Sequence, residues 1–138
     1  GNGMDVCLCK LEKLEDGSTQ VHFTGSKRSL FYYHQEQLFE IKGDRISIGG
    51  FSKEQKTSFN THKIHLQSGD MLYLTTDGYV DAPNISRKSF GTARFKRLME
   101  SSAPLPIGQQ KQKFEQVLKA FSKGTEQRDD ITIMGIRV

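Results

Sequence analysis

The order of predicted elements constrains the fold of this 138-residue chain most strongly. Strand-like segments fill its first half, two helix-like segments follow, and one further strand closes it. This order differs from the regular strand–helix alternation of doubly wound folds, and it predicts an α+β layered domain with mostly antiparallel pairing. A chain of this length is the size of one domain and can bury roughly two-thirds of the surface that its unfolded form exposes.

Short apolar segments separated by turn residues predict the strands. The predicted strands cover residues 6–14, 21–24, 30–33, 38–41, 59–66 and 71–76. An Asp16-Gly17 turn joins the first two into a hairpin, and the next pair forms a second hairpin. The run 71–76 is almost continuously apolar, which predicts a central position in a sheet.

Two helices and a closing strand are predicted in the second half. Thr92 is predicted to cap a helix through Ser101, and Pro104 and Pro106 end it. A second, amphipathic helix ends near Gly124. Its apolar residues are Phe114, Val117, Leu118 and Phe121, and those of the closing strand are Ile131, Ile133 and Ile136.

Carboxylates stand where two of these predicted strands end or begin. Asp77-Gly78 directly follows the apolar run 71–76, and Asp129-Asp130 directly precedes the closing strand. Antiparallel pairing of the two strands would bring Asp77 near Asp129 or Asp130, where a divalent cation would relieve their repulsion. With oxygen ligands the expected ion is Mg²⁺ or Mn²⁺. An Asp-Gly turn and a solvated acid pair remain the alternative reading.

Basic residues give a second candidate surface. The chain has a formal net charge of +4 and a pI near 9.1, which indicates weak attraction to acidic partners without choosing among them. Arg87, Lys88 and Arg94 lie in a stretch without acids that can recognise a phosphoprotein or form a solvated face. Phe90 and Phe95 are interleaved with these cations, but they read as core residues, so nucleic acid is not the expected partner.

Other features indicate where the protein works. No apolar run approaches the roughly 20 residues of a membrane helix, and no signal-peptide pattern is present, so a cytoplasmic location is expected. Cys7 and Cys9 lie on one face of a predicted strand, which predicts free thiols in a reducing compartment. His62 and His65 lie three apart and cannot jointly bind a metal. The chain opens with Gly1 and a strand follows at once, as expected for part of a longer protein.

Five segments carry motifs that occur together and in order along almost the whole chain. They are Phe23-Thr24-Gly25-Ser26-Lys27-Arg28-Ser29-Leu30, Ile46-Ser47-Ile48-Gly49-Gly50, the stretch 66–78 with Thr75-Thr76-Asp77-Gly78, Phe90-Gly91, and Gln127-Arg128-Asp129-Asp130-Ile131-Thr132. Each motif is weak alone. The ordered set resembles the C-terminal half of the SpoIIE-like branch of bacterial PPM (PP2C-type) serine/threonine phosphatases.

The resemblance implies a fold and an activity. The fold is a sandwich of antiparallel sheets flanked by helices, with residues 1–138 as the C-terminal portion of a single domain. Asp77 and Asp129 are implied as catalytic metal ligands, with Asp130 as the less favoured choice, for two Mn²⁺ or Mg²⁺ ions. A metal-activated water attacks the phosphorus of a phosphoserine or phosphothreonine. The implied partner is a phosphorylated STAS-domain regulatory protein, and Arg87, Lys88 and Arg94 are its candidate contacts.

One part of the family pattern has no counterpart here. The family has an Asp in an early strand and an Asp-x-x-Gly-x-Gly-type metal motif, and Asp5 replaces neither. Asp77 and Asp129 cannot complete a two-metal centre, so the chain alone is expected to be inactive. A non-catalytic interaction or dimerisation module derived from a phosphatase domain is the alternative. The resemblance also implies an upstream sensor or regulatory domain and a possible membrane tether in the parent protein.

Overall fold

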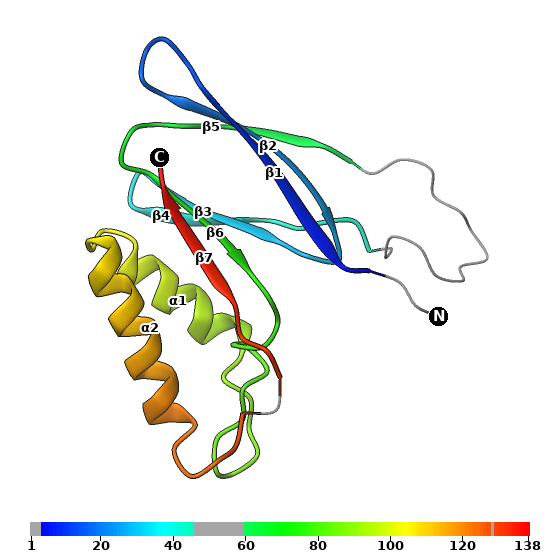
Figure 1. Ribbon diagram of the computed structural model, residues 1–138, viewed down its shortest axis with the longest axis vertical. Coiled ribbons are helices and arrows are strands. Elements are labelled where there is room, and N and C mark those ends of the chain that lie inside the picture. Colours follow the sequence, from blue (N-terminus) through cyan, green and yellow to red (C-terminus); the bar gives the residue numbers. More distant parts are fainter. Residues whose placement is uncertain (1–3, 46–59, 128) are drawn as a thin grey trace, which may run out of the picture.

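Two antiparallel sheets lie face to face, and two helices cover the outer side of one of them (Figure 1). This computed structural model describes residues 4–45, 60–127 and 129–138. One sheet has the order β1 (Val6–Lys13), β2 (Thr19–Ser26) and β5 (His62–Leu66). The other has the order β4 (Gln37–Ile41), β3 (Leu30–His34), β6 (Met71–Thr75) and β7 (Ile133–Arg137). The α+β sandwich predicted from the sequence is confirmed.

The central position of β6 is also confirmed, because β3 and β7 pair with it on either side. Successive residues of a strand point to opposite faces, so a strand buried on both faces is apolar throughout. Leu72 points into the inter-sheet core, which we define as the buried residues Val21, Phe23, Leu30, Leu66 and Leu72. Met71 and Tyr73 point toward the helices.

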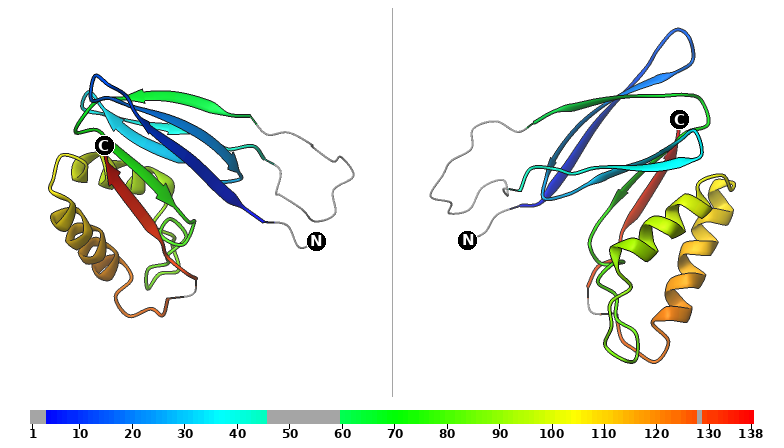
Figure 2. Two further views of the ribbon diagram at one scale, coloured as in Figure 1. Left: turned by 45° about the horizontal axis from the view of Figure 1, so that its top comes forward. Right: turned by 180° about the vertical axis from the view of Figure 1, so that it is seen from behind.

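The helices α1 (Thr92–Ser102) and α2 (Ile107–Phe121) pack on the same side of the four-stranded sheet (Figure 2). Their apolar faces enclose the helix-side core, whose buried residues are Phe31, Met71, Tyr73, Tyr79, Phe90, Phe95, Leu98, Met99, Ala103 and Phe114. Phe90 and Phe95 therefore fill the core, as expected. Tyr79 is 1% exposed, and burial raises the pKa of its hydroxyl, so the side chain is neutral at physiological pH.

The predicted cap of the first helix is wrong. Thr92 is the first residue of α1, Gly91 occupies the N-cap position, and the helix N-terminus has no side-chain cap. Gly91 adopts a φ of 90°, which glycine reaches without steric cost, and its amide donates to the Val80 carbonyl. This backbone contact directs the entry into α1, so a capping hydroxyl is not needed.

The three-stranded sheet carries both cysteines of the chain on β1. Cys7 and Cys9 face inward against the inter-sheet core, and both are half-buried free thiols, in agreement with the sequence. A hydrogen bond to Cys9, ahead of burial, raises the pKa of Cys7. Phe59 and the Ile46–Gly50 motif fall outside the described residues. No helix in the described part of the chain is long and apolar enough to cross a membrane.

An ion pair links α1 to β4 and predicts a pH dependence. Lys96 Nζ lies 2.8 Å from Glu40 Oε1. Burial raises the pKa of Glu40, but hydrogen bonds from Lys96 and Ser29 outweigh burial and hold this pKa below its ordinary 4.5. The stabilisation is therefore complete above pH 4.5 and is lost as the pH falls through the folded-state pKa. Because Lys96 is partly exposed, we expect the ion pair to contribute about 0.5 kcal/mol to the free energy of unfolding.

Urea unfolding of the wild type and of Lys96→Met at pH 7 and pH 3.5 tests whether the ion pair between Lys96 and Glu40 loses its stabilising effect in acid. The difference in unfolding free energy between the two proteins is expected to shrink at pH 3.5. Lys10→Met, which removes an exposed lysine from β1, is the control and should show no such change. A difference that stays constant between the two pH values would contradict the prediction.

A candidate metal and phosphate site at the end of β6

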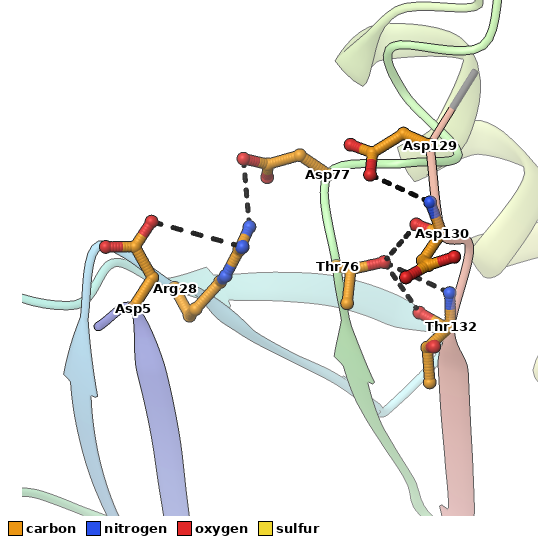
Figure 3. Close-up of polar contacts among 7 residues, drawn as sticks. All are labelled: Asp5, Arg28, Thr76, Asp77, Asp129, Asp130 and Thr132. Atoms are coloured by element: carbon orange, nitrogen blue, oxygen red, sulfur yellow. Dashed lines mark hydrogen bonds and ion pairs between the residues drawn. The ribbon is translucent and has the colours of Figure 1, made fainter. Parts of the chain in front are cut away.

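The antiparallel pairing of β6 with β7 brings the two acidic segments together. Thr75 lies opposite Ile133 in the register, and the pairing continues one residue further, where the Thr76 amide donates to the Thr132 carbonyl at 3.0 Å. The Thr132 amide in turn donates to Thr76 Oγ1 at 3.0 Å. The end of β6 therefore lies beside the start of β7, as the sequence predicted (Figure 3).

Gly78 allows the backbone after Asp77 to approach the acidic segment closely. A Cβ atom placed on Gly78 would overlap the carbonyl oxygen of Asp130, and it would also crowd a side-chain carbon of Ile131. The absence of a side chain thus lets the two segments come into backbone contact. Gly78 was predicted only as a turn residue. The backbone contact that it allows with Asp130 was not predicted from the sequence.

Replacing Gly78 by Ala is expected to lower the free energy of unfolding by about 2 kcal/mol, because backbone atoms must move apart to make room for the methyl group. Chemical denaturation measures this difference. Gly108→Ala is the control: nothing lies within 4 Å of its added Cβ. Gly108 is the second residue of α2, and alanine is compatible with a helical backbone, so this change should raise stability by about 0.4–1 kcal/mol. Equal effects of the two substitutions would show that the contact at Gly78 is unimportant.

The three carboxylates point in different directions (Figure 3). Asp77 turns toward Arg28, whose Nη1 lies 2.9 Å from Asp77 Oδ2. Asp129 Oδ1 accepts a hydrogen bond from the Asp130 amide at 2.8 Å. The Asp77 side chain is 66% exposed, and Asp129 and Asp130 are also exposed, so all three can be reached from solvent.

These carboxylates do not form a complete metal-binding cluster by themselves. Within residues 4–45, 60–127 and 129–138, no three His, Cys, Asp or Glu side chains are grouped so that they could hold one metal ion. The assignment of Asp77, Asp129 and Asp130 as metal ligands, and of the first two as catalytic, stays a prediction. Their oxygen donors are of the type that Mg²⁺ and Mn²⁺ prefer.

Sequence reasoning gave no role to Arg28, which is the side chain in contact with Asp77. It lies in the connection between β2 and β3, 49 positions from Asp77 in the chain, and its Nη2 is 4.0 Å from Asp5 Oδ2. The sequence signal that could have indicated a role for Arg28 was its place in the motif 23–30, where the basic pair Lys27-Arg28 lies between two strands. Only the sheet packing shows that this connection reaches the end of β6 (Figure 3).

The three candidate substrate contacts occupy two different elements. Arg87 and Lys88 are exposed in the loop before α1, where the Asn84 amide donates to the Lys88 carbonyl at 2.8 Å. Arg94 lies on α1, and its guanidinium carbon is 5.2 Å from the centre of the Phe121 ring. Arg94 thus has a packing contact of its own. Substrate binding by these residues stays a prediction.

An open cleft of about 730 Å³ lies beside Asp129. Gly78 and Asp81 line one part of it, and Lys119 in the last turn of α2 and Lys123 just after this helix line another. Glu115 and Glu126 also line the cleft, so with Asp81 and Asp129 its acidic side chains outnumber the two lysines, and its charge does not select an anionic ligand.

The family model for stage II sporulation protein E (SpoIIE) matches residues 6–138 of the chain, which include all three carboxylates. The chain belongs to the SpoIIE family. The predicted relationship to SpoIIE/PP2C-type phosphatase domains is thereby confirmed. No curated protein sequence matches the chain.

Solved structures of SpoIIE-family and PP2C domains share this fold. The PP2C domain of SiaA from Pseudomonas aeruginosa is 32% identical, with a TM-score of 0.76, over 86% of this chain and 46% of that chain. The phosphatase domain of SpoIIE from Bacillus subtilis, presoaked with Mn, is 18% identical, with a TM-score of 0.62, over 97% and 56% of the two chains. The chain thus spans about half the length of these relatives. Its assignment as the C-terminal portion of one domain stays a prediction.

Proposed function

We propose that this chain is the C-terminal portion of a metal-dependent protein serine/threonine phosphatase domain. The observation that carries the proposal is the meeting of Asp77 with Asp129 and Asp130 where β6 ends and β7 begins, in a member of the SpoIIE family. The substrate would be a phosphoserine or phosphothreonine on a cytoplasmic regulatory protein, of which a STAS-domain protein is the expected example.

The donors present suit the expected metal. Asp77 and Asp129, with Asp130 as the alternative, would hold Mn²⁺ or Mg²⁺ through carboxylate oxygens. The relative from Bacillus subtilis was presoaked with Mn, which supports this choice. Such ions activate water for attack on phosphorus and neutralise phosphate charge. The chain's own residues would fix the ion at a rigid sheet end, where the backbone contacts of Thr76 and Gly78 limit movement.

The chain by itself is proposed to be inactive. A centre of two ions needs more carboxylates than the end of β6 offers, since no group of three ligands occurs among the described residues. Further ligands would come from the part of the relatives that this chain does not span.

A non-catalytic interaction or dimerisation module is the second candidate. Met4 and Leu8 are 61% and 68% exposed, and Leu8 lies on β1 at the edge of its sheet. Exposed apolar residues at a sheet edge favour contact with another chain.

The test is an assay of Mn²⁺-dependent hydrolysis of a phosphoserine peptide, by the chain alone and by a form extended upstream. Activity of the extended form alone, abolished by a chelator, is the expected result. Activity of the short chain would contradict the proposal that its metal site is incomplete. If neither form hydrolyses the peptide, the phosphatase proposal fails and the interaction module becomes the better account.

A further inference from the structure

Arg28 holds a fixed place at the candidate site. It lies between β2 and β3, where the chain passes from one sheet to the other. Its guanidinium stands between the carboxylates of Asp77 and Asp5, at 2.9 Å and 4.0 Å (Figure 3). The Arg28 side chain is 23% exposed, whereas the Asp77 side chain beside it is 66% exposed. The cation is therefore largely enclosed, beside a carboxylate that solvent can reach.

The backbone that carries Arg28 has little freedom to move. The Lys27 amide donates to the Asp44 carbonyl at 2.6 Å, and the Asp44 amide donates to the Gly25 carbonyl at 2.7 Å. A Cβ atom on either Gly25 or Gly43 would overlap the Arg28 carbonyl oxygen. Two glycines are thus required for the close backbone packing around Arg28. This packing fixes the backbone at Arg28, and the contacts with Asp77 and Asp5 hold its side chain, so less conformational entropy is lost when a ligand binds.

The guanidinium keeps hydrogen-bonding capacity that its neighbours do not use. Nη1 is buried, and no described residue accepts a hydrogen bond from it with suitable geometry. Its 2.9 Å contact with Asp77 is close enough for an ion pair but lacks this geometry. Leaving a charged donor without an acceptor is costly. A planar fork of N–H donors matches the oxygens of a phosphate group, which can accept two parallel bonds.

Charge at the site points to the same ligand. A phosphate dianion that approaches Asp77, Asp129 and Asp130 meets like charges, so it needs a cation close to the reacting end. Among the described residues, no other Lys or Arg forms an ion pair with Asp77. Arg28 is therefore the protein cation that is placed to offset this repulsion when a metal ion has taken over part of the Asp77 charge.

We propose that Arg28 is a substrate-binding residue that donates hydrogen bonds to the non-bridging oxygens of the phosphoserine or phosphothreonine phosphate. The inference rests on the proposed phosphatase function and names the group that would bind the phosphate there. It extends the candidate contacts Arg87, Lys88 and Arg94, which lie in the loop before α1 and on α1.

The test compares the wild type with Arg28→Gln, Arg28→Lys and a control, Lys63→Gln, which removes an exposed charge from β5. Binding of inorganic phosphate in the presence of Mn²⁺ is measured by calorimetry. The upstream-extended form of the protein is used, because it is the form expected to be active. Arg28→Gln is expected to weaken phosphate binding about tenfold or more, and to raise KM for the phosphopeptide more than it lowers kcat. Arg28→Lys keeps the positive charge but loses the planar fork of N–H donors. Its affinity for phosphate should therefore lie between those of the wild type and Arg28→Gln. Lys63→Gln should match the wild type.

The outcomes separate this inference from the proposed function. A folded Arg28→Gln protein with unchanged phosphate affinity and KM overturns the role of Arg28, even if the wild type is an active phosphatase. A wild type that binds no phosphate overturns it as well. Phosphate binding that depends on Arg28, without hydrolysis by the wild type, supports the inference and rejects the phosphatase. If Arg28→Gln fails to fold in a thermal melt, Arg28→Lys decides by the same two measurements.

Discussion

Replacing Asp77 by Asn is expected to lower kcat/KM for a phosphoserine peptide by about 100-fold or more, in the form of the protein that is active. The amide keeps the size of the side chain but removes the negative charge that attracts a divalent cation. Groups that merely orient a metal ligand are typically worth about 10–100-fold, so loss of the ligand itself should cost at least as much. Apparent Mn²⁺ affinity should fall in parallel.

The stability of this variant separates chemistry from folding. The Asp77 side chain is 66% exposed, and the amide oxygen of an asparagine could still accept a hydrogen bond from Arg28, so Asp77→Asn should change the free energy of unfolding by less than about 1 kcal/mol. Glu100→Gln, on the exposed side of α1, is the isosteric control and should keep full activity. An Asp77→Asn protein that retains wild-type kcat/KM and Mn²⁺ dependence would remove Asp77 from the proposed metal site.

Replacing Tyr79 by Ala is expected to destabilise the protein by about 3–5 kcal/mol. Tyr79 is 1% exposed. Its ring centre lies 4.9 Å from that of Phe95, which it stacks on, and 5.1 Å from that of Phe90, which it meets edge-on. Removing the ring leaves a cavity among aromatic side chains that fix each other's positions. A typical domain has a stability of only about 5–15 kcal/mol, so this single change would remove a large share of it.

Tyr79→Phe isolates the contribution of the hydroxyl. The hydroxyl donates to the Phe114 carbonyl at 2.8 Å, which ties the segment after Asp77 to α2. Its loss is expected to cost about 1 kcal/mol, since the ring and its packing remain. Urea denaturation measures both variants. A loss for Tyr79→Ala no larger than for Tyr79→Phe would show that packing around Tyr79 contributes little.

Much of the fold could be predicted because the strands and helices carry clear periodic patterns. The apolar run of β6 indicated a strand buried on both sides, and the spacing of Phe114, Val117, Leu118 and Phe121 indicated the buried stripe of α2. The cap of α1 was mispredicted at Thr92, because a hydroxyl before an apolar stretch is a local signal. The actual entry at Gly91 depends on a backbone contact with Val80.

The candidate site could be predicted only in part, for a similar reason. The meeting of Asp77 with Asp129 and Asp130 follows from one strand pairing, which the sequence suggested. The approach of Arg28 to Asp77 requires two sheets to pack face to face, with the connection between β2 and β3 at one particular end. No pattern within a single strand encodes that relation.

The two hairpin turns in the described part of the chain lie at the end opposite the carboxylates. The turn between β1 and β2 and the turn between β3 and β4 lie near Ser18 and His34, and His34 Nδ1 contacts Asp70 at the start of β6, 2.6 Å away. Added residues at these turns would leave the site end unchanged, whereas one residue added inside β6 would turn its following side chains to the opposite face. These two hairpin turns can therefore vary in length without disturbing the carboxylates, whereas the lengths of β6 and β7 must stay constant for Asp77 to meet Asp129 and Asp130.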